Sequence, residues 1–464
     1  IQAFNSNGFT AGQGSVGGDY ISWTFRKAPK FFDVVTYTGD NSSSARDIAH
    51  SLGQAPGMII IKRYSDAGYG WPVWHRSLSN GYWTYLNTTD AQTNASGIPI
   101  FANNDQQTST HFQLPATNGN VGFFNASGES YVAYLFGHDT SSDGMIQCGS
   151  YTGDGGSSNS VNLGFEPQWV LIKASTNTGS TDRWVILDNI RGILTNGDDK
   201  RLYADYTGAE LSAGGITLTP SGFYLESNNE YNSNGATYIY MAIRRAPMQT
   251  PTTRASVLDI QRAASPFTAD FPTDLAIQKN VTSTGSWYAI TRLAGYDKYL
   301  QFNYNADEGS LADQGLDSST QWGGTSWGSQ SIGYSFRRAP NFFEIVTYVG
   351  TGSAKTENHG LGVVPEMMWV KNRSDSEDWA VYYGDATDYL KLNNTDATAD
   401  SNAFWNDTAP TSTVFTIGSD DDVNKNNSNY TAYLFATLAG ISKVGTFSHT
   451  NGSSTDVDCG FSSG

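Results

Sequence analysis

The sequence is short of cysteine, of basic residues and of long apolar runs. It has 464 residues but only two cysteines, Cys148 and Cys459, which are too few for a disulfide-stapled scaffold or a thiolate metal site. Lys and Arg number 27 against 44 Asp and Glu, a net charge of −17 that repels phosphate backbones and anionic lipid surfaces. We therefore expect no nucleic-acid partner.

Long helices are missing as well. No window approaches the roughly 20 consecutive apolar residues that a membrane helix needs, so we expect no membrane partner. Only residues 254–264 resemble an amphipathic helix. With 49 glycines, abundant Asn, Ser and Thr, and 13% aromatic residues, the composition is typical of short strands joined by turns. The sequence predicts an all-β protein.

The sequence repeats itself with a period of about 100 residues. FRKAPKFFDVVTYTG at 25–39 and FRRAPNFFEIVTYVG at 336–350 agree at most positions. After each apolar opening strand comes a Gly, then a Pro three residues later and a Lys six residues after the Pro. The three clear copies of this pattern are Gly53-Pro56-Lys62, Gly164-Pro167-Lys173 and Gly362-Pro365-Lys371. A diverged copy, FPTDLAIQK from Phe271, has Gln278 where we expect the Lys.

Each repeat closes on a strand of alternating character. The five copies are YISWTF, YVAYLF, YIYMAI, SIGYSF and YTAYLF, and they begin 111, 107, 93 and 99 residues apart. One period is therefore one small domain, and its closely spaced turn clusters fit a two-sheet antiparallel sandwich. We predict tandem antiparallel β-sandwich domains, jelly-roll-like and of about 100 residues each, in a row.

The repeat also predicts domain boundaries. They are 1–33 for the C-terminal part of a truncated β unit, 34–138 and 144–246 for β-sandwich repeats, 247–267 for a linker, 268–338 for a divergent shorter repeat, 344–437 for a β-sandwich repeat and 443–464 for the N-terminal part of a truncated unit. Half a sandwich exposes unpaired strand edges, so we expect the polypeptide to continue or a neighbouring chain to complete the halves. The short joints elsewhere predict a stiff row of domains.

Repeat register also gives expectations for cysteine and histidine. Cys148 and Cys459 align with apolar positions, which predicts two buried free thiols that pack as small hydrophobic groups. His50 and His359 occupy matching positions in a loop, which predicts a structural role in a turn.

The motifs of the enzyme classes with sharp signatures do not occur in the sequence. There is no nucleophile elbow, zinc-protease helix, phosphate-binding loop or dinucleotide fingerprint. Carboxylates are plentiful, which leaves a polysaccharide hydrolase as a minor alternative. Asp420, Asp421 and Asp422 are candidates for Ca²⁺ ligands, but a solvated hairpin tip also explains them. We predict no enzyme, and no catalytic, cofactor-binding or metal-binding residues.

Aromatic residues fall into repeated and unrepeated positions. The repeated ones, which we predict to be core, are Trp71, Trp184, Trp287 and Trp379 at one position, and Trp23, Tyr134, Tyr240, Tyr334 and Tyr433 on the closing strands. The unrepeated ones are Tyr82, Trp83 and Tyr85 in GYWTYL and Trp322 and Trp327 in QWGGTSWG. Because Trp and Tyr faces stack on sugar rings, these five are the glycan-binding candidates, with packing between domains or chains as the competing interpretation.

Two stretches resemble a known group of domains. HGLGVVPEMMWVKNRSDSEDWAVYY at 359–383 and the residues that follow it, up to YTAYLFA, resemble a repeat domain of phage tail-fibre and other virion proteins, particularly of marine phages. LGFEPQWVLIK, WVILDNIRG and YIYMAIRRAPM within 163–248 are similar to its alternating partner domain. The resemblance covers nearly the whole chain, although 268–338 departs from the pattern. It carries over no catalytic residue.

The resemblance implies an extracellular location on a virion surface or tail. It also implies self-association into a homo-oligomer, commonly a trimer, together with other virion proteins. The sequence thus favours a non-enzymatic structural or adhesive segment of a phage tail fibre or other virion appendage, which spaces or presents host-receptor contacts. Two alternatives stay open: a lectin-like array that binds a host cell-surface glycan, and a bacterial surface adhesin.

Overall fold

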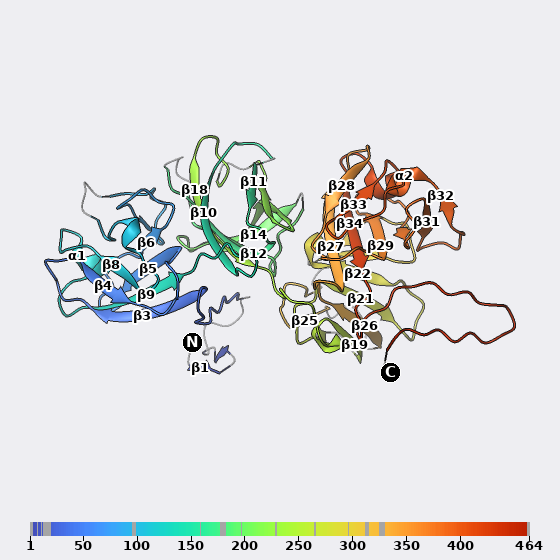
Figure 1. The fold of residues 1–464 in the computed structure, drawn as a ribbon, viewed down its shortest axis with the longest axis horizontal. Coiled ribbons are helices and arrows are strands. Elements are labelled where there is room, and N and C mark those ends of the chain that lie inside the picture. Colours follow the sequence, from blue (N-terminus) through green and yellow to red (C-terminus); the bar gives the residue numbers. More distant parts are fainter. Residues whose placement is uncertain are drawn as a thin grey trace. The chain divides into compact units, whose positions relative to one another are not determined.

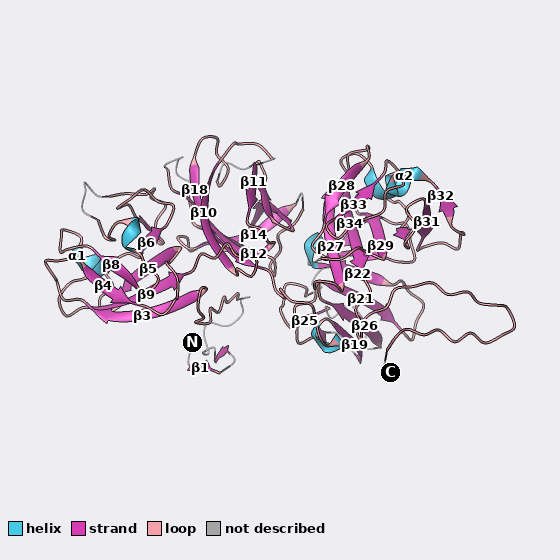
Figure 2. Cartoon of the chain, viewed as in Figure 1, coloured by secondary structure: helices cyan, strands magenta, loops and turns pink. Residues whose placement is uncertain are grey.

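The computed structural model describes the chain except residues 1, 2, 7, 11, 13–19, 95–98, 158, 177–181, 196, 228, 229, 264, 265, 296, 311–314, 324–329 and 462–464. The fold is nearly all β, and its several sheets are antiparallel (Figures 1 and 2). The helices of the described residues are single turns: α1 (Val121–Phe124), α2 (Asn402–Trp405), α3 (Asp421–Asn424) and three 3₁₀ turns, Asn104–Gln106, Arg254–Ser256 and Arg292–Ala294. The all-β prediction is confirmed.

The chain divides into two compact units. The first comprises Ile1–Leu86, Gln92–Asp139 and Gly144–Cys148, and the second comprises Asn87–Ala91, Thr140–Asp143 and Gly149–Gly464.

Four copies of one arrangement, here called repeats 1 to 4, follow one another along the sequence. Repeat 1 (32–136) has a five-stranded sheet in the order β3-β9-β5-β6-β7 and a β4-β8 pair. Its strands are β3 (Phe32–Thr38), β4 (Arg46–Ala49), β5 (Met58–Arg63), β6 (Pro72–His75), β7 (Thr84–Tyr85), β8 (His111–Leu114) and β9 (Ser130–Phe136). Repeat 2 (146–244) has a six-stranded sheet, β10-β18-β12-β13-β14-β15, and a three-stranded sheet, β11-β17-β16. Its strands are β10 (Ile146–Thr152), β11 (Asn159–Asn162), β12 (Pro167–Ala174), β13 (Val185–Asp188), β14 (Asp198–Tyr203), β15 (Leu211–Gly214), β16 (Ile216–Thr219), β17 (Gly222–Leu225) and β18 (Thr237–Arg244).

Repeats 3 and 4 each combine a six-stranded sheet with a two-stranded one. Repeat 3 (258–336) has the orders β19-β26-β21-β22-β23-β24 and β20-β25, and repeat 4 (343–435) has β27-β34-β29-β30-β31-β32 and β28-β33. The strands of repeat 3 are β19 (Leu258–Ala263), β20 (Phe267–Thr268), β21 (Leu275–Asn280), β22 (Tyr288–Thr291), β23 (Lys298–Gln301), β24 (Gly309–Ser310), β25 (Gln321–Trp322) and β26 (Ser331–Phe336). Those of repeat 4 are β27 (Phe343–Val349), β28 (Lys355–Asn358), β29 (Met367–Asn372), β30 (Ala380–Tyr382), β31 (Asp388–Lys391), β32 (Ala399–Asp400), β33 (Val414–Ile417) and β34 (Asn429–Phe435).

In every repeat the closing strand lies between the opening strand and the strand that carries the motif Lys. It is thus central in the large sheet, and its side chains alternate between two faces. In repeat 1, Tyr131, Ala133 and Leu135 enter the core between the two sheets. Tyr134 therefore lies on the opposite face, which we call the outer face of the large sheet.

The repeated Trp and Tyr side chains are only in part the core residues that we predicted. Trp184, Tyr240, Trp379 and Tyr433 are buried, whereas Trp23, Trp71, Tyr134 and Tyr334 are partly exposed and Trp287 is 36% exposed. The physical reason is alternation: these positions, apart from Tyr240, belong to the outer face, so they are buried only where another part of the chain covers that face.

Strand register corrects two alignments. Tyr240 pairs with Ile172, whereas Tyr134, Tyr334 and Tyr433 sit one position further along their strands. Tyr240 accordingly faces the core of repeat 2, because a shift of one residue moves a side chain to the other face. In repeat 3 the motif Lys is also present, but as Lys279 and not at Gln278, since Lys279 pairs with Ile332 just as Lys62 pairs with Val132.

The motif Lys fastens the hairpin that follows it. Lys62, Lys173 and Lys279 each donate to the carbonyl oxygen two residues before the repeated Trp, which belongs to Tyr69, Asp182 and Gly285 respectively. Lys173 and Lys371 reach a further carbonyl, that of Thr89 at 2.8 Å and that of Asn305 at 3.2 Å. In repeats 1 to 3 the Lys thus ties its strand to the segment that leads into the repeated Trp.

The predicted linker 247–267 is wrong for its second half. Residues Leu258–Ala263 form β19, which pairs along its length with β26 and serves as the opening strand of repeat 3. The helical pattern of 254–264 likewise gives only one 3₁₀ turn before this strand. A central closing strand needs a partner on each edge, and this tertiary requirement overrides the weak helical pattern.

The two ends of the chain do not form the half-sandwiches that we predicted. Near the N-terminus the described residues form the short hairpin of β1 (Ala3–Asn5) and β2 (Gly8–Thr10), and 20–27, which contains the predicted closing strand, has no strand. Residues 443–461 also contain no strand and are largely exposed. None of the helices in the described part of the chain has the length and hydropathy that crossing a bilayer would take.

The two cysteines differ in exposure, so one of our two expectations is confirmed and the other is wrong. Cys148 is buried and free, and burial raises the pKa of its thiol. Cys459 is free but exposed, because no sandwich forms around the segment that carries it.

This difference predicts the reactivity of the thiols. In the native protein we expect Cys459 alone to react quickly with a thiol reagent such as Ellman's reagent, because the thiolate is the reactive form and needs access. A denaturant should expose Cys148 and double the titre. The Cys459→Ser variant should show almost no fast reaction, and a fast native reaction in that variant would contradict the burial of Cys148.

Candidate functional site

The large sheets of repeats 3 and 4 pack against each other through their outer faces. One apolar cluster contains Leu275 and Ile277 of repeat 3 together with Ile345, Trp379 and Tyr433 of repeat 4. On the inner face of the same sheet, Ala276 and Ile290 belong to a separate small core of repeat 3. Repeat 3 is therefore not an independent domain, since much of the outer face of its large sheet is buried by repeat 4.

Polar contacts fix the register of this shared core. The Trp379 indole Nε1 donates to the carbonyl oxygen of Gln301 at 2.9 Å, and its ring lies 5.0 Å from that of Phe302. The hydroxyls of Thr291 and Tyr433 are 2.6 Å apart and form a buried hydrogen bond. These contacts hold the indole of repeat 4 against the end of β23 in repeat 3.

A buried cluster of five charged residues, here called the Arg338 cluster, joins repeats 2, 3 and 4. It consists of Glu166 and Arg245 from repeat 2 and its end, Asp274 and Arg338 from repeat 3 and its end, and Glu344 from repeat 4. Arg338 is 1% exposed. Its Nη1 and Nη2 contact the two carboxylate oxygens of Glu166 at 3.1 and 2.9 Å, and Nη1 also contacts Glu344 at 3.2 Å.

The remaining members complete the cluster. Arg245 contacts Glu344 at 3.0 Å and Glu166 at 3.2 Å, and Asp274 accepts from the backbone N–H of Arg338 at 2.7 Å. Burial alone lowers the pKa of the Arg338 guanidinium, but the nearby carboxylates of Glu166, Asp274 and Glu344 raise it above its ordinary value. The guanidinium of Arg338 therefore stays charged, and its contacts join three repeats at one point.

Our sequence reasoning did not single out this cluster, although the sequence carries a signal for it. Arg-Arg-Ala-Pro occurs at 244–247 and at 337–340, and Arg-Lys-Ala-Pro at 26–29. An acidic residue opens the strand after two of these motifs, as Asp33 and Glu344. At the first motif the pair is Lys27 with Asp33, at 2.6 Å. A basic residue that recurs shortly before an acidic residue near the start of a strand indicates an ion pair where one repeat follows another.

Two of the predicted glycan-binding residues, Trp83 and Trp322, are buried. Trp83 is 1% exposed within the core of repeat 1, and Tyr82 and Tyr85 beside it are partly exposed. Trp322 is also 1% exposed: its ring stacks on Phe267 at 4.5 Å, and its Nε1 donates to Ser335 at 2.7 Å. Burial removes both indoles as platforms for a sugar. Trp327 lies outside the described residues.

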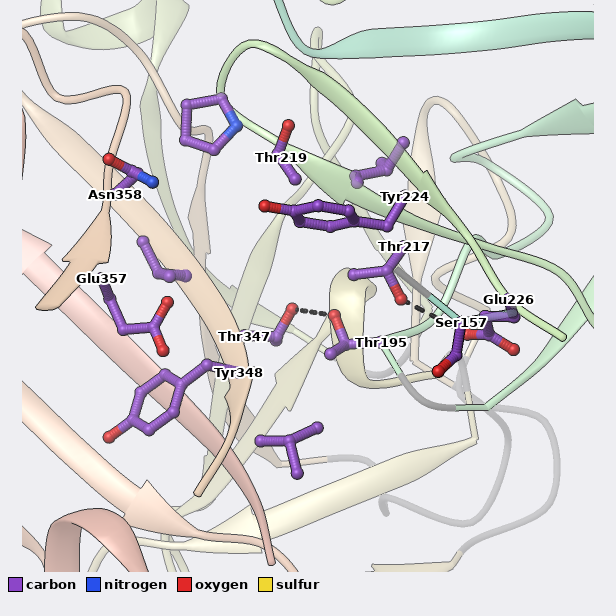
Figure 3. A pocket seen from close by; sticks show the side chains of 14 residues that line it. Ser157, Thr195, Thr217, Thr219, Tyr224, Glu226, Thr347, Tyr348, Glu357 and Asn358 are labelled. Carbon is purple, nitrogen blue, oxygen red and sulfur yellow. Dashed lines mark hydrogen bonds between the residues drawn. The ribbon is translucent and has the colours of Figure 1, made fainter. Parts of the chain in front are cut away.

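A polar cleft of about 380 Å³ lies within the second compact unit, between the β16-β17 hairpin and strands β27 and β28 (Figure 3). Its lining is rich in hydroxyl groups, and the hydroxyls of Thr195 and Thr347 hydrogen-bond across it at 2.5 Å. Tyr224, which is 44% exposed, presents its ring to the cleft, opposite Glu357 and Asn358.

The carboxyl groups of this cleft already have partners. Glu226 accepts from the backbone N–H of Gly215 at 3.1 Å and from Thr217 at 3.3 Å, and Glu357 pairs with Lys355 at 2.5 Å. Burial raises the pKa of both Glu226 and Glu357, against the opposing effect of these contacts. The cleft can accept a small polar ligand, but its carboxylates are held in place by the fold.

The acidic run near the C-terminus is a helix start. Asp420 accepts from the backbone N–H of Asp422 at 2.9 Å and so caps α3, while Asp422 pairs with Lys391 at 3.1 Å. Among the described residues, no group of three or more His, Cys, Asp or Glu side chains is placed to hold a metal ion.

His50 and His359 accept from the backbone N–H groups of Leu52 and Leu361 through Nδ1, which confirms their predicted role in a turn.

Two buried lysines predict a pH dependence of stability. Burial lowers the pKa of Lys173 and of Lys371 to about 8, and both side chains are 0% exposed. In the unfolded chain a lysine titrates near about 10.4, so between these values the unfolded state binds more protons and stability rises with pH. We expect the free energy of unfolding to increase relative to that of the Lys173→Met, Lys371→Met variant as the pH rises from about 8 towards 10.

Urea unfolding of both proteins at several pH values measures this difference. Because the comparison is made at equal pH, the titration of other groups, such as Cys148, cancels. If the difference in free energy of unfolding between the two proteins stayed constant across this pH range, the inferred burial of the ammonium groups would be contradicted.

Comparison with known proteins gives a family but no activity. No curated protein matches the chain. A protein-family model described as "Domain of unknown function (DUF7483)" matches residues 1–247 and 336–463, and so passes over 248–335, which contains repeat 3. Since these two segments make up most of the chain, the protein belongs to the DUF7483 family of domains of unknown function.

Proposed function

We propose that the chain is a non-enzymatic structural and adhesive segment of a phage tail fibre or another virion surface appendage, where it spaces or presents contacts to a host receptor. The observation that carries the mechanical part of this proposal is the fusion of repeats 3 and 4 through one core, with repeat 2 tied to them by the Arg338 cluster. Repeats joined in this way resist bending, which is what a spacer requires.

The virion location rests on the resemblance of the repeats to domains of phage tail-fibre proteins. Self-association into a homo-oligomer and assembly with other virion proteins belong to the same proposal. The alternative to the virion location is a bacterial surface adhesin built from the same kind of stiff array.

Stiffness can be tested by distance measurements between spin labels. In a Cys459→Ser background, labels at the exposed positions Tyr206→Cys in repeat 2 and Val364→Cys in repeat 4 should give one narrow distance distribution. A broad distribution would remove the basis for a spacer. Immunogold labelling of particles tests the location, and release of reducing ends from host polysaccharide would overturn the non-enzymatic assignment.

A second candidate function is glycan binding. It is favoured by a groove at the contact of repeats 3 and 4 that is lined by five aromatic rings, and this groove differs from the sites that the sequence predicted.

A further inference from the structure

We propose that this groove between repeats 3 and 4 is a binding site for a neutral saccharide. It has a volume of about 540 Å³ and is lined by five aromatic rings, those of Trp287, Phe302, Tyr334, Phe336 and Trp369. Pockets that present several aromatic faces beside a few polar groups are the usual form of a small-ligand site in proteins. Tyr334 and Phe336 belong to β26, and the other three rings come from three different strands or strand ends of the two packed sheets.

The repeat itself provides the comparison that singles out Trp287. At the same position, Trp184 is 1% exposed and Trp379 is 0% exposed, whereas Trp287 is 36% exposed. In repeat 1 the ammonium of Lys62 lies 5.5 Å above the ring of Trp71. Trp287 lies beside Tyr334 with ring centroids 6.3 Å apart, as Trp71 lies beside Tyr134 at 6.4 Å, and it lines the groove. An indole left open at a position that repeats 2 and 4 bury indicates a binding surface.

Amide groups at the rim supply donors for hydroxyl groups. Asn303 accepts from the backbone N–H of Trp287 at 3.0 Å, and Asn394 accepts from that of Asp396 at 3.0 Å. With their oxygens used in this way, the Nδ2 groups of both side chains are left to donate to a ligand. Asn393 differs, since it accepts from Trp379 and donates to Asp378.

The charge of the lining argues for a neutral sugar. The described residues that line the groove are apolar, Tyr, Asn and Thr, with no charged side chain among them, while the whole chain carries a net charge of −17 that disfavours anionic ligands. A pyranose has C–H groups on its faces and hydroxyls around its edge, which matches aromatic rings bordered by amides. The ligand class is therefore a neutral hexose-containing glycan.

Binding can be measured on the full chain with a glycan array, followed by calorimetry with the strongest neutral oligosaccharide. We expect Trp287→Ala to weaken binding about tenfold or more, since one aromatic stacking contact is worth about a power of ten in affinity. Trp287→Phe should keep part of the affinity, and Asn303→Asp should lose it by removing a donor. Trp71→Ala, at the same position of repeat 1, is the matched control and should bind as the unaltered chain does.

Each other outcome would overturn the proposal. These outcomes are the absence of binding to any neutral glycan, equal binding by the Trp287→Ala variant, preference for an anionic glycan, and capture of an alkyl or aromatic compound alone. Loss of a homodimer on Trp287→Ala would identify a second copy as the occupant. The inference rests on the second candidate function, glycan binding, and not on the virion spacer, because a chain found outside a virion could still bind the sugar, and a virion spacer could fail to.

Discussion

Replacing Arg338 by methionine should destabilise the second compact unit by about 3–5 kcal/mol, because removing one partner leaves buried carboxylates without compensation. Arg338 is 1% exposed and contacts both Glu166 and Glu344. Apolar packing by methionine restores volume but no charge. Urea unfolding followed by circular dichroism measures the loss.

The expected loss of stability comes from the buried carboxylates that Arg338 no longer compensates, so removing one of these carboxylates serves as a control. Adding Glu344→Gln to Arg338→Met should recover part of the loss, although the single Glu344→Gln change is itself destabilising. A second control is Lys200→Met, which removes an ion pair of 4.0 Å between Lys200 and Glu210 outside the Arg338 cluster. This change should lower the free energy of unfolding by about 1 kcal/mol or less. If Arg338→Met cost no more than Lys200→Met, the cluster would not join the repeats.

The second large effect is expected for Trp379→Ala, which should cost about 3–5 kcal/mol. The indole is 0% exposed in the core that repeats 3 and 4 share, and its loss leaves the carbonyl of Gln301 without this donor. Because the same side chain joins two sheets, we also expect cleavage by a protease to increase near 337–342, between β26 and β27. Urea unfolding and limited proteolysis measure the two effects.

Trp287→Ala is the matched control, since Trp287 occupies the same repeat position but is 36% exposed. Its cost should stay below about 1.5 kcal/mol, because a half-open side chain leaves little cavity behind. Equal losses for the two variants would show that the outer faces of repeats 3 and 4 do not pack as described. The same comparison separates the structural from the ligand-binding use of one repeated tryptophan.

Local patterns predicted the strands well because each carries its own signal. The opening strand of repeat 4, the apolar run ending in Lys371 and the closing strand at 430–435 all lie where their motifs place them. The alternation of these strands also predicted that two faces exist. It did not predict which face the repeated Trp and Tyr occupy, because an alternating strand looks the same from either side.

The candidate sites were much harder to predict, because each depends on residues far apart in the sequence. Trp83 and Trp322 appeared available because they are not repeated, yet both fill a core. Trp287 appeared structural because it is repeated, yet it is the most exposed of the four tryptophans at that position. The exposure of an outer-face side chain depends on whether another sheet or segment packs over it. A repeat pattern does not show which copy of the position has no such neighbour.

The amino-acid sequence by itself determined that this protein is a series of acidic antiparallel β repeats, since charge, turn residues and strand periodicity are local properties. Only the tertiary structure decided that the outer faces of repeats 3 and 4 share a core, that Glu166, Arg338 and Glu344 meet, and that Trp287 borders a groove. These contacts join residues that are distant in the chain, so they follow from the packing of whole sheets and not from any single segment.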